Sequence, residues 1–266
     1  MHLLIISGIL SLGSLAYLIW LWRKRLVETS QSFFTLADAV LAALIVAGLG
    51  MIMLLNFVLM LRQDSSQEAV SFTLGGVVFA VIFYIATYGT AAAFICIWMV
   101  VREINPWQAF GLHRLDWRML GTAFGCFLAG LALVIFAQEL LEQLAGKFPL
   151  QPLVIFWIEN DGWLDRTVVA VFAVVVAPVF EEIVFRGYFY GILKRYTGIV
   201  AAAIIVSAFF AVVHMHWPAL PGLFIVGMVF TFAYERSGSL TAPIVCHALF
   251  NTASLIGALL FPDRII

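Results

Sequence analysis

The feature that most constrains this chain is a series of eight apolar runs, each near the length of about 20 residues that a helix needs to cross a bilayer. The predicted helices cover residues 3–22, 36–61, 71–101, 119–141, 165–195, 198–215, 219–235 and 240–261. Inside lipid the backbone must satisfy its own hydrogen bonds, and runs of this length favour helices over a closed barrel. The sequence therefore predicts an all-α polytopic membrane protein, a bundle of about eight transmembrane helices.

The composition agrees with a lipid environment and excludes several other classes. Hydrophobic residues make up 64% of the 266 residues and charged residues only 11%, whereas soluble domains are about a quarter charged. A formal net charge of −1 gives no basic surface for nucleic acid. The three cysteines stand far apart in apolar runs, which indicates packing and neither a disulfide framework nor a metal cluster. They are Cys96, Cys126 and Cys246.

The positions of the basic residues predict the orientation of the helices. With the N-terminus outside, the inside loops hold nine Lys and Arg, the outside loops hold four, and Arg186 is embedded, which accounts for all 14. This bias follows the positive-inside rule. The inside set is Arg23, Lys24, Arg25, Arg102, Arg114, Arg118, Lys194, Arg195 and Arg236, and the outside set is Arg62, Lys147, Arg166 and Arg264. We expect both termini outside, a longest outside loop near residues 143–164 and, for a bacterial chain, a place in the plasma (inner) membrane.

Charged residues interrupt the apolar run that begins at Ala177. Pro178 has no N–H for the preceding turn, so a kink and a free carbonyl are expected before the glutamates. Glu182 and Arg186 are spaced i,i+4, the geometry of an ion pair within one helix. Glu181 lies about 100° round the helix and is left to face another group. A Glu–Arg pair can simply hold helices together, but a second embedded glutamate favours a functional site.

Two later helices add polar groups that suit proton transfer or hydrogen bonding. The helix ending near residue 215 carries Phe210 and, one turn on, His214. The last helix carries His247 and Asn251 on one face, at spacing i,i+4. Each histidine alone is more often a hydrogen-bonded structural residue than a catalytic one. Counted from the predicted helix ends, Glu181 and His214 fall toward the outer half of the membrane and His247 nearer the inner face.

These motifs together resemble the CPBP family of intramembrane proteases, also called the Abi domain. The family includes type II CAAX prenyl endopeptidases and bacteriocin-processing and immunity proteins. The matching patterns are EE-x-x-F-R-G from Glu181, F-x-x-x-H from Phe210 and H-x-x-x-N from His247, in the family's order. The resemblance covers about residues 165–260. It implies a protease core at 161–266, with the active site between the last four helices, and motif-free helices at 1–160, all in one continuous membrane domain.

The resemblance also implies a reaction and a set of roles. The reaction would be hydrolysis of a peptide bond in a membrane protein or a lipidated peptide, with the bilayer as the other partner. Glu181 and His214 would activate water, and His247 and Asn251 would stabilise the oxyanion. Glu182, Arg186 and Phe210 would support them.

Other chemistries and functions stay open at this point. No H-E-x-x-H motif is present, and Ser237-Gly238-Ser239, the nearest serine-protease pattern, is predicted to lie in a turn between helices. A mechanism without metal is favoured, but a zinc site formed by Glu181, His214 and His247 remains an alternative. A proton-coupled transporter would also use embedded charges and a proline-containing helix. A non-catalytic immunity or scaffold membrane protein is the third alternative.

Overall fold

The structure is a computed structural model that describes residues 2–23, 33–62, 74–112, 116–146, 148 and 151–261. Within these ranges all regular secondary structure is helical. Five helices are long and apolar enough to cross a membrane, and three shorter apolar segments accompany them. The chain is therefore an integral, multi-pass membrane protein, as predicted. Lys24, Arg25, Arg114, Lys147 and Arg264, which enter the predicted charge count, lie outside the described residues.

The eight predicted helices are all found, and most of their ends differ from the prediction by only a few residues. Six are single helices: α1 (His2–Arg23), α2 (Leu36–Arg62), α6 (Trp117–Ala145), α11 (Ile199–Val213), α12 (Leu220–Ser237) and α13 (Thr241–Leu260). The third is continued by a π-helical segment, in the order α3 (Leu74–Tyr84), η1 (Ile85–Gly89) and α4 (Thr90–Val101). The fifth contains two such segments, in the order α8 (Trp163–Val171), η2 (Phe172–Val176), α9 (Ala177–Glu182), η3 (Ile183–Tyr190) and α10 (Gly191–Thr197). Short helices α5 (Pro106–Ala109) and α7 (Pro152–Glu159) and the 3-10 turn η4 (Trp217–Ala219) lie between them.

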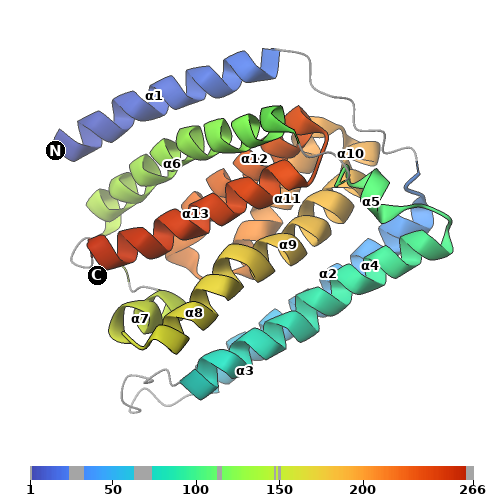
Figure 1. Cartoon of the computed structure of the whole chain (residues 1–266), viewed down its shortest axis with the longest axis horizontal. Helices are drawn as coiled ribbons and strands as arrows, with labels where there is room; N and C mark the ends of the chain where they lie inside the picture. Colours follow the sequence, from blue (N-terminus) through green and yellow to red (C-terminus); the bar gives the residue numbers. More distant parts are fainter. Residues whose placement is uncertain are drawn as a thin grey trace.

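The helices run side by side along one direction (Figure 1). The central group consists of α6, α11, α12, α13 and the helix that contains α9. Helix α1 lies along α6, and its Ser11 hydroxyl donates to the carbonyl oxygen of Ala132 at 2.9 Å. Helices α2 and α3–α4 lie on the other side of the central group. The start of α1 and the end of α13 are at the same side of the bundle, which agrees with an even number of crossings between them.

A buried carboxylate fastens α2 to α4 at the end of the bundle predicted to face inside. Asp38 is fully buried, and the sequence alone accounts for it only as a charge favoured by the N-terminal dipole of α2. In the fold it has a specific cation, because Arg102 Nη1 lies 2.5 Å from Asp38 Oδ2. Trp98 Nε1 and the Thr35 hydroxyl also donate to this carboxylate, at 2.9 and 2.7 Å. Asp38 therefore ties α2 to α4, a pairing that no spacing in the sequence predicts.

Helix α7 lies at the opposite end of the bundle, in a segment that the sequence predicts to be part of an outside loop. Its eight residues are too short to cross a bilayer, so a search for membrane-spanning runs does not detect this helix. Trp157 on α7 is nevertheless buried, and its Nε1 donates to the carbonyl oxygen of Leu255 at 2.8 Å. Arg166 lies over the Trp157 ring at 5.8 Å. The loop thus packs on α13 near its C-terminal end.

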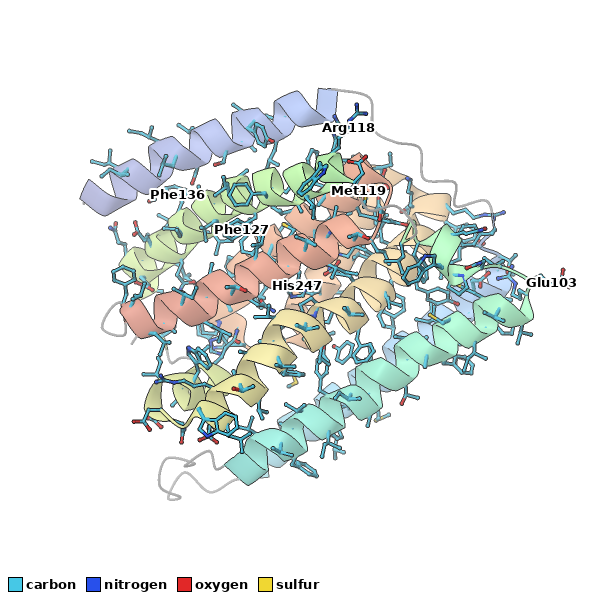
Figure 2. The ribbon with its side chains drawn as sticks, viewed as in Figure 1. Glu103, Arg118, Met119, Phe127, Phe136 and His247 are labelled. Carbon is cyan, nitrogen blue, oxygen red and sulfur yellow. The ribbon has the colours of Figure 1, made fainter. Side chains whose placement is uncertain are left out.

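The core between η3, α11, α12 and α13 is aromatic and closely packed. Phe185, Phe210 and Phe230 are all buried, and the rings of Phe185 and Phe210 meet edge to face at 5.2 Å. Helices α11 and α12 come so close that a Cβ added to Gly227 would lie 2.9 Å from the Ser207 Cβ, so this contact requires glycine. His247 points from α13 into the middle of the bundle (Figure 2). The polar groups of the candidate active site lie in this core.

The orientation is tested by single cysteines at two exposed tryptophans. Trp117 begins α6 after a predicted inside loop, and Trp163 begins α8 after a predicted outside loop. In a variant lacking the three natural cysteines, a membrane-impermeant thiol reagent should label Trp163→Cys on intact cells. Trp117→Cys should be labelled only after the membrane is permeabilised. Labelling of both sites from the same side would contradict the predicted topology.

Candidate active site

The helix that carries the two glutamates is irregular where it enters the site. In η2 the Ala177 N–H donates to the Phe172 carbonyl, five residues back. The next N–H would come from residue 178, but Pro178 has none. The carbonyl of Ala173 is therefore left without its helical donor, and Asn251 Nδ2 on α13 donates to it at 2.7 Å. The freed carbonyl expected near Pro178 exists, one residue earlier than the Val174 carbonyl that a simple proline kink would free, and it fixes Asn251.

The predicted ion pair between Glu182 and Arg186 is present. Arg186 Nη1 lies 2.9 Å from Glu182 Oε1, and both side chains are fully buried. Arg186 Nη2 also donates to the carbonyl oxygen of Gly227 at 3.0 Å. The guanidinium carbon lies 4.5 Å from the centre of the Phe210 ring and 5.1 Å from that of Phe230. Arg186 is thus held by charge, by a hydrogen bond and by two aromatic faces.

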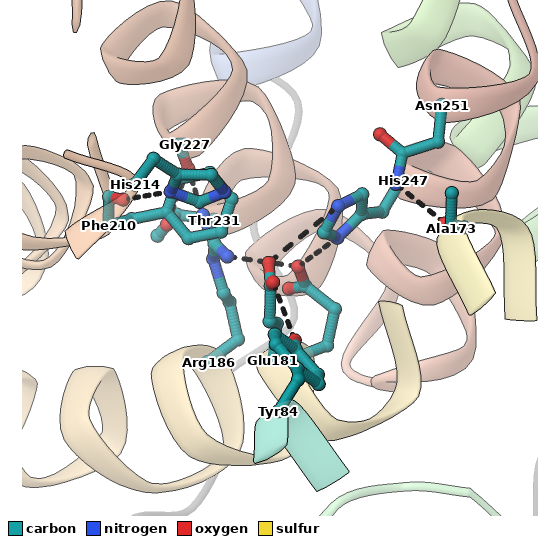
Figure 3. Close-up of polar contacts among 11 residues, drawn as sticks. Tyr84, Ala173, Glu181, Arg186, Phe210, His214, Gly227, Thr231, His247 and Asn251 are labelled. Atoms are coloured by element: carbon teal, nitrogen blue, oxygen red, sulfur yellow. Dashed lines mark hydrogen bonds and ion pairs between the residues drawn. The ribbon is translucent and has the colours of Figure 1, made fainter. Parts of the chain in front are cut away.

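His247 lies between the two glutamates (Figure 3). Its Nδ1 is 2.9 Å from Glu182 Oε1, and because an ionised carboxylate only accepts, Nδ1 is the donor in this contact. Its Nε2 then faces Glu181, 3.8 Å from Oε2, and its ring stacks on Phe230 at 4.5 Å. The depth expected from the sequence is therefore wrong for this pair, since His247 and Glu181 lie at the same level.

Glu181 has a partner that the sequence reading missed. The Tyr84 hydroxyl at the end of α3 donates to Glu181 Oε1 at 2.6 Å. The other oxygen, Oε2, is buried and has no hydrogen-bond partner among the described residues. The available signal was weak: the run Tyr84-Ile-Ala-Thr-Tyr88 puts two tyrosines on one face in the middle of an apolar helix.

His214 stands apart from this cluster. It follows the last residue of α11, its Nδ1 lies 2.7 Å from the Phe210 carbonyl oxygen, and its ring centre is 4.7 Å from that of Phe210. Phe210 also meets His247, with the ring centres 5.9 Å apart, so Phe210 contacts both histidines. Among the described residues, no ion pair within 4.0 Å joins His214 to Glu181. The predicted pairing of these two residues stays a prediction.

The donors do not form a metal site as they stand. In the part of the chain that the structure describes, no group of three or more His, Cys, Asp or Glu side chains is arranged to hold a metal ion. The predicted ligand set of Glu181, His214 and His247 is not brought together among these residues, since His214 packs on the ring of Phe210 while His247 contacts both glutamates. The residues present therefore do not fit zinc in this arrangement.

Ser239, in the serine-protease pattern, is also placed. It lies in the turn between α12 and α13, and its hydroxyl donates to the Gly111 carbonyl oxygen at 2.7 Å. It is a structural residue of the turn, well separated along α13 from His247.

Fold and site together define a polytopic helical membrane protein with a buried cluster of Glu181, Glu182 and His247 and with the partly buried Asn251 one turn further along α13. Residues 163–253 match the family model described as type II CAAX prenyl endopeptidase Rce1-like. All the motif residues lie inside this segment, so the resemblance inferred from the motifs is confirmed there. No solved structure matches the chain.

The names of two curated relatives agree with this family match. YdiL of Bacillus subtilis, named as a candidate membrane peptidase, is 34% identical over 82 residues, which are 31% of this chain and 34% of that protein. The membrane-embedded CAAX protease MroQ of Staphylococcus aureus is 31% identical over 100 residues, 35% of this chain and 40% of that protein. An uncharacterized 24.3 kDa protein of Escherichia coli is 27% identical over 183 residues, 64% of this chain and 78% of that protein. The chain thus spans well under half the length of the first two relatives.

Arg186 is expected to be required for stability. Arg186→Ala leaves the Glu182 carboxylate buried without its cation, which costs roughly 3–5 kcal/mol. Thermal unfolding in detergent should show a large loss, and Arg118→Ala at an exposed arginine should show little. Adding Glu182→Gln to Arg186→Ala should recover part of the loss, because glutamine carries no charge. An Arg186→Ala protein as stable as the parent would contradict a structural role.

Proposed function

We propose that this protein is an intramembrane endopeptidase that hydrolyses a peptide bond of a membrane-associated protein or peptide. One observation carries the proposal. Inside an apolar bundle, Glu181 keeps one buried carboxylate oxygen without a partner, and that oxygen faces His247 Nε2 across 3.8 Å. The family match and the names of two relatives support the same class of activity.

The proposed base is the free oxygen of Glu181. A water beside Oε2 gives up a proton to the carboxylate while its oxygen attacks the carbonyl carbon of the substrate. The C–N bond of the resulting tetrahedral intermediate then breaks, and the proton held by Glu181 passes to the leaving amine. Glu182 acts on this centre through His247, whose Nδ1 it holds at 2.9 Å, so that Nε2 is the ring atom turned toward the reaction.

His247 and Asn251 are proposed as donors to the oxyanion, His247 in its imidazolium form, because Nδ1–H is used by Glu182 and Nε2 must carry a second proton to donate. They follow one another by one turn on α13, so they share a face. One N–H of the Asn251 amide is used by the Ala173 carbonyl, and a primary amide has a second N–H to offer. The bond to Ala173 fixes the rotamer of Asn251, which is the preorganisation that oxyanion stabilisation requires. His214 is retained as a partner of Glu181 in water activation, on the strength of the family resemblance.

Zinc takes no part in this mechanism. A chelator added to the purified protein separates the two mechanisms. Loss of cleavage that returns with added zinc would replace the proposed glutamate mechanism with a metal-dependent one.

The remaining candidates are a proton-coupled transporter and a non-catalytic scaffold. Either would leave membrane peptides intact. Both predict that Glu181→Gln, which keeps the shape of the side chain, changes no peptide length.

Glu181→Gln should abolish cleavage. The amide cannot take a proton from water, while the Tyr84 hydroxyl can still donate to its oxygen. Mass spectrometry of membrane peptides from cells that make the intact protein or the variant should show shortened peptides only with the intact protein. Equal thermal stability of the two proteins is the control. Identical peptide sets from the two cell lines would contradict the protease proposal.

Asn251→Ala should lower turnover by about 10²–10³ if its amide donates to the oxyanion. Asn251→Asp should be at least as damaging, because it puts a carboxylate beside a developing negative charge and against the Ala173 carbonyl. Thr252→Ala is the matched control, since the neighbouring Thr252 hydroxyl binds only the Ala248 carbonyl of its own helix. Near-normal turnover by Asn251→Asp would remove Asn251 from the oxyanion site.

A further inference from the structure

A residue from the part of the chain without motifs reaches into the proposed active site. Tyr84 lies at the end of α3, far outside the family-matched segment 163–253. Its hydroxyl donates to Glu181 Oε1 at 2.6 Å, a short distance typical of an O–H bond to a charged oxygen. In the proposed mechanism Oε2 of the same carboxylate accepts the proton, so Tyr84 binds the oxygen that the reaction does not use.

The tyrosine ring is itself held on two sides. It stacks on Tyr88, with the ring centres 4.6 Å apart, and meets Phe172 edge to face at 4.9 Å. Phe172 is the first residue of η2, the π segment that frees the Ala173 carbonyl, and Tyr84 directly precedes the π segment η1. Two irregular helices therefore meet at this ring, and irregularities of this kind often mark functional sites.

A glutamate side chain has several rotatable bonds, and ordering it costs conformational entropy. A hydrogen bond at Oε1 limits the rotation of the carboxylate and keeps Oε2 directed at His247 Nε2. Catalytic groups lose much of their effect when they are displaced by about 1 Å. Fixing this carboxylate therefore bears directly on the rate.

We propose that Tyr84 is a positioning residue, which acts through Glu181 by holding Oε1 so that Oε2 is presented to water. The inference rests on the proposed protease function. It also implies that α3 and η1 complete the active site, and that the C-terminal segment alone lacks one of its parts.

The bond itself is tested by thermal stability, without any need for activity. Tyr84→Phe removes only the hydroxyl and keeps the ring contacts with Tyr88 and Phe172. In a double-mutant cycle with Glu181→Ala, Tyr84→Phe should lower the unfolding temperature of the parent but not that of Glu181→Ala. Equal losses in both backgrounds would mean that the hydroxyl does not act through Glu181, and would overturn the proposal.

The positioning role is tested by cleavage kinetics. With purified protein in detergent and a peptide whose shortening depends on Glu181, Tyr84→Phe should lower kcat about tenfold or more while KM changes little. Tyr88→Phe is the matched control, because it removes a hydroxyl from the same stacked pair with no bond to Glu181 in the structure. It should keep near-normal kcat.

The outcomes separate the two proposals. Normal kcat for Tyr84→Phe, with a coupled loss of stability, would make Tyr84 a structural residue only and overturn the positioning role. A parallel rise in KM would make it a binding residue. If the intact protein shortens no peptide, the protease function fails and the positioning role fails with it, while the stability cycle still reports whether the bond exists.

Discussion

The arrangement of this site depends on the burial of the Glu182–Arg186 pair in the middle of an apolar bundle. Neither side chain has any exposure, so each charge needs the other. The pair also does more than cancel charge. Arg186 reaches α12 through the Gly227 carbonyl, and Glu182 reaches α13 through His247 Nδ1. One charged pair thereby sets the spacing of three helices and the orientation of the histidine between the glutamates.

The sequence predicted the fold closely because lipid leaves few choices. Run length and the need for internal backbone hydrogen bonds determined the eight helices. The Glu182–Arg186 bond followed from spacing within one helix. These features are local, so they can be read from neighbouring positions, whereas α7 was missed because its apolar run is shorter than a membrane span.

Contacts between helices were much harder to predict. Tyr84 and Glu181 are 97 positions apart, and Arg102 and Asp38 are 64 apart, so no spacing rule connects them. The depth of Glu181 relative to His247 was misjudged because counting from helix ends assumes uniform helices, whereas the helix of Glu181 is 35 residues long and irregular. The chain in fact contains π segments, which change both rise and rotation. The resemblance named the polar residues of the site, but only tertiary packing shows that His247 lies between Glu181 and Glu182 while His214 lies across Phe210.

Because η2 is a π segment, the geometry of the site depends on the number of residues in η2. An α-helix turns by about 100° per residue, and η2 holds a wider turn just before the glutamates. Removing one residue between Ala173 and Pro178 would restore the ordinary helical turn and rotate Glu181 and Glu182 away from His247, while Pro178 would then occupy the position of the donor to the Ala173 carbonyl and still supply no N–H. Substitutions in η2 change only side chains. An insertion or deletion there rotates every later residue of the same helix about the helix axis. Apart from Phe172, whose ring packs on Tyr84, this stretch is therefore a place where the composition can vary and the length cannot.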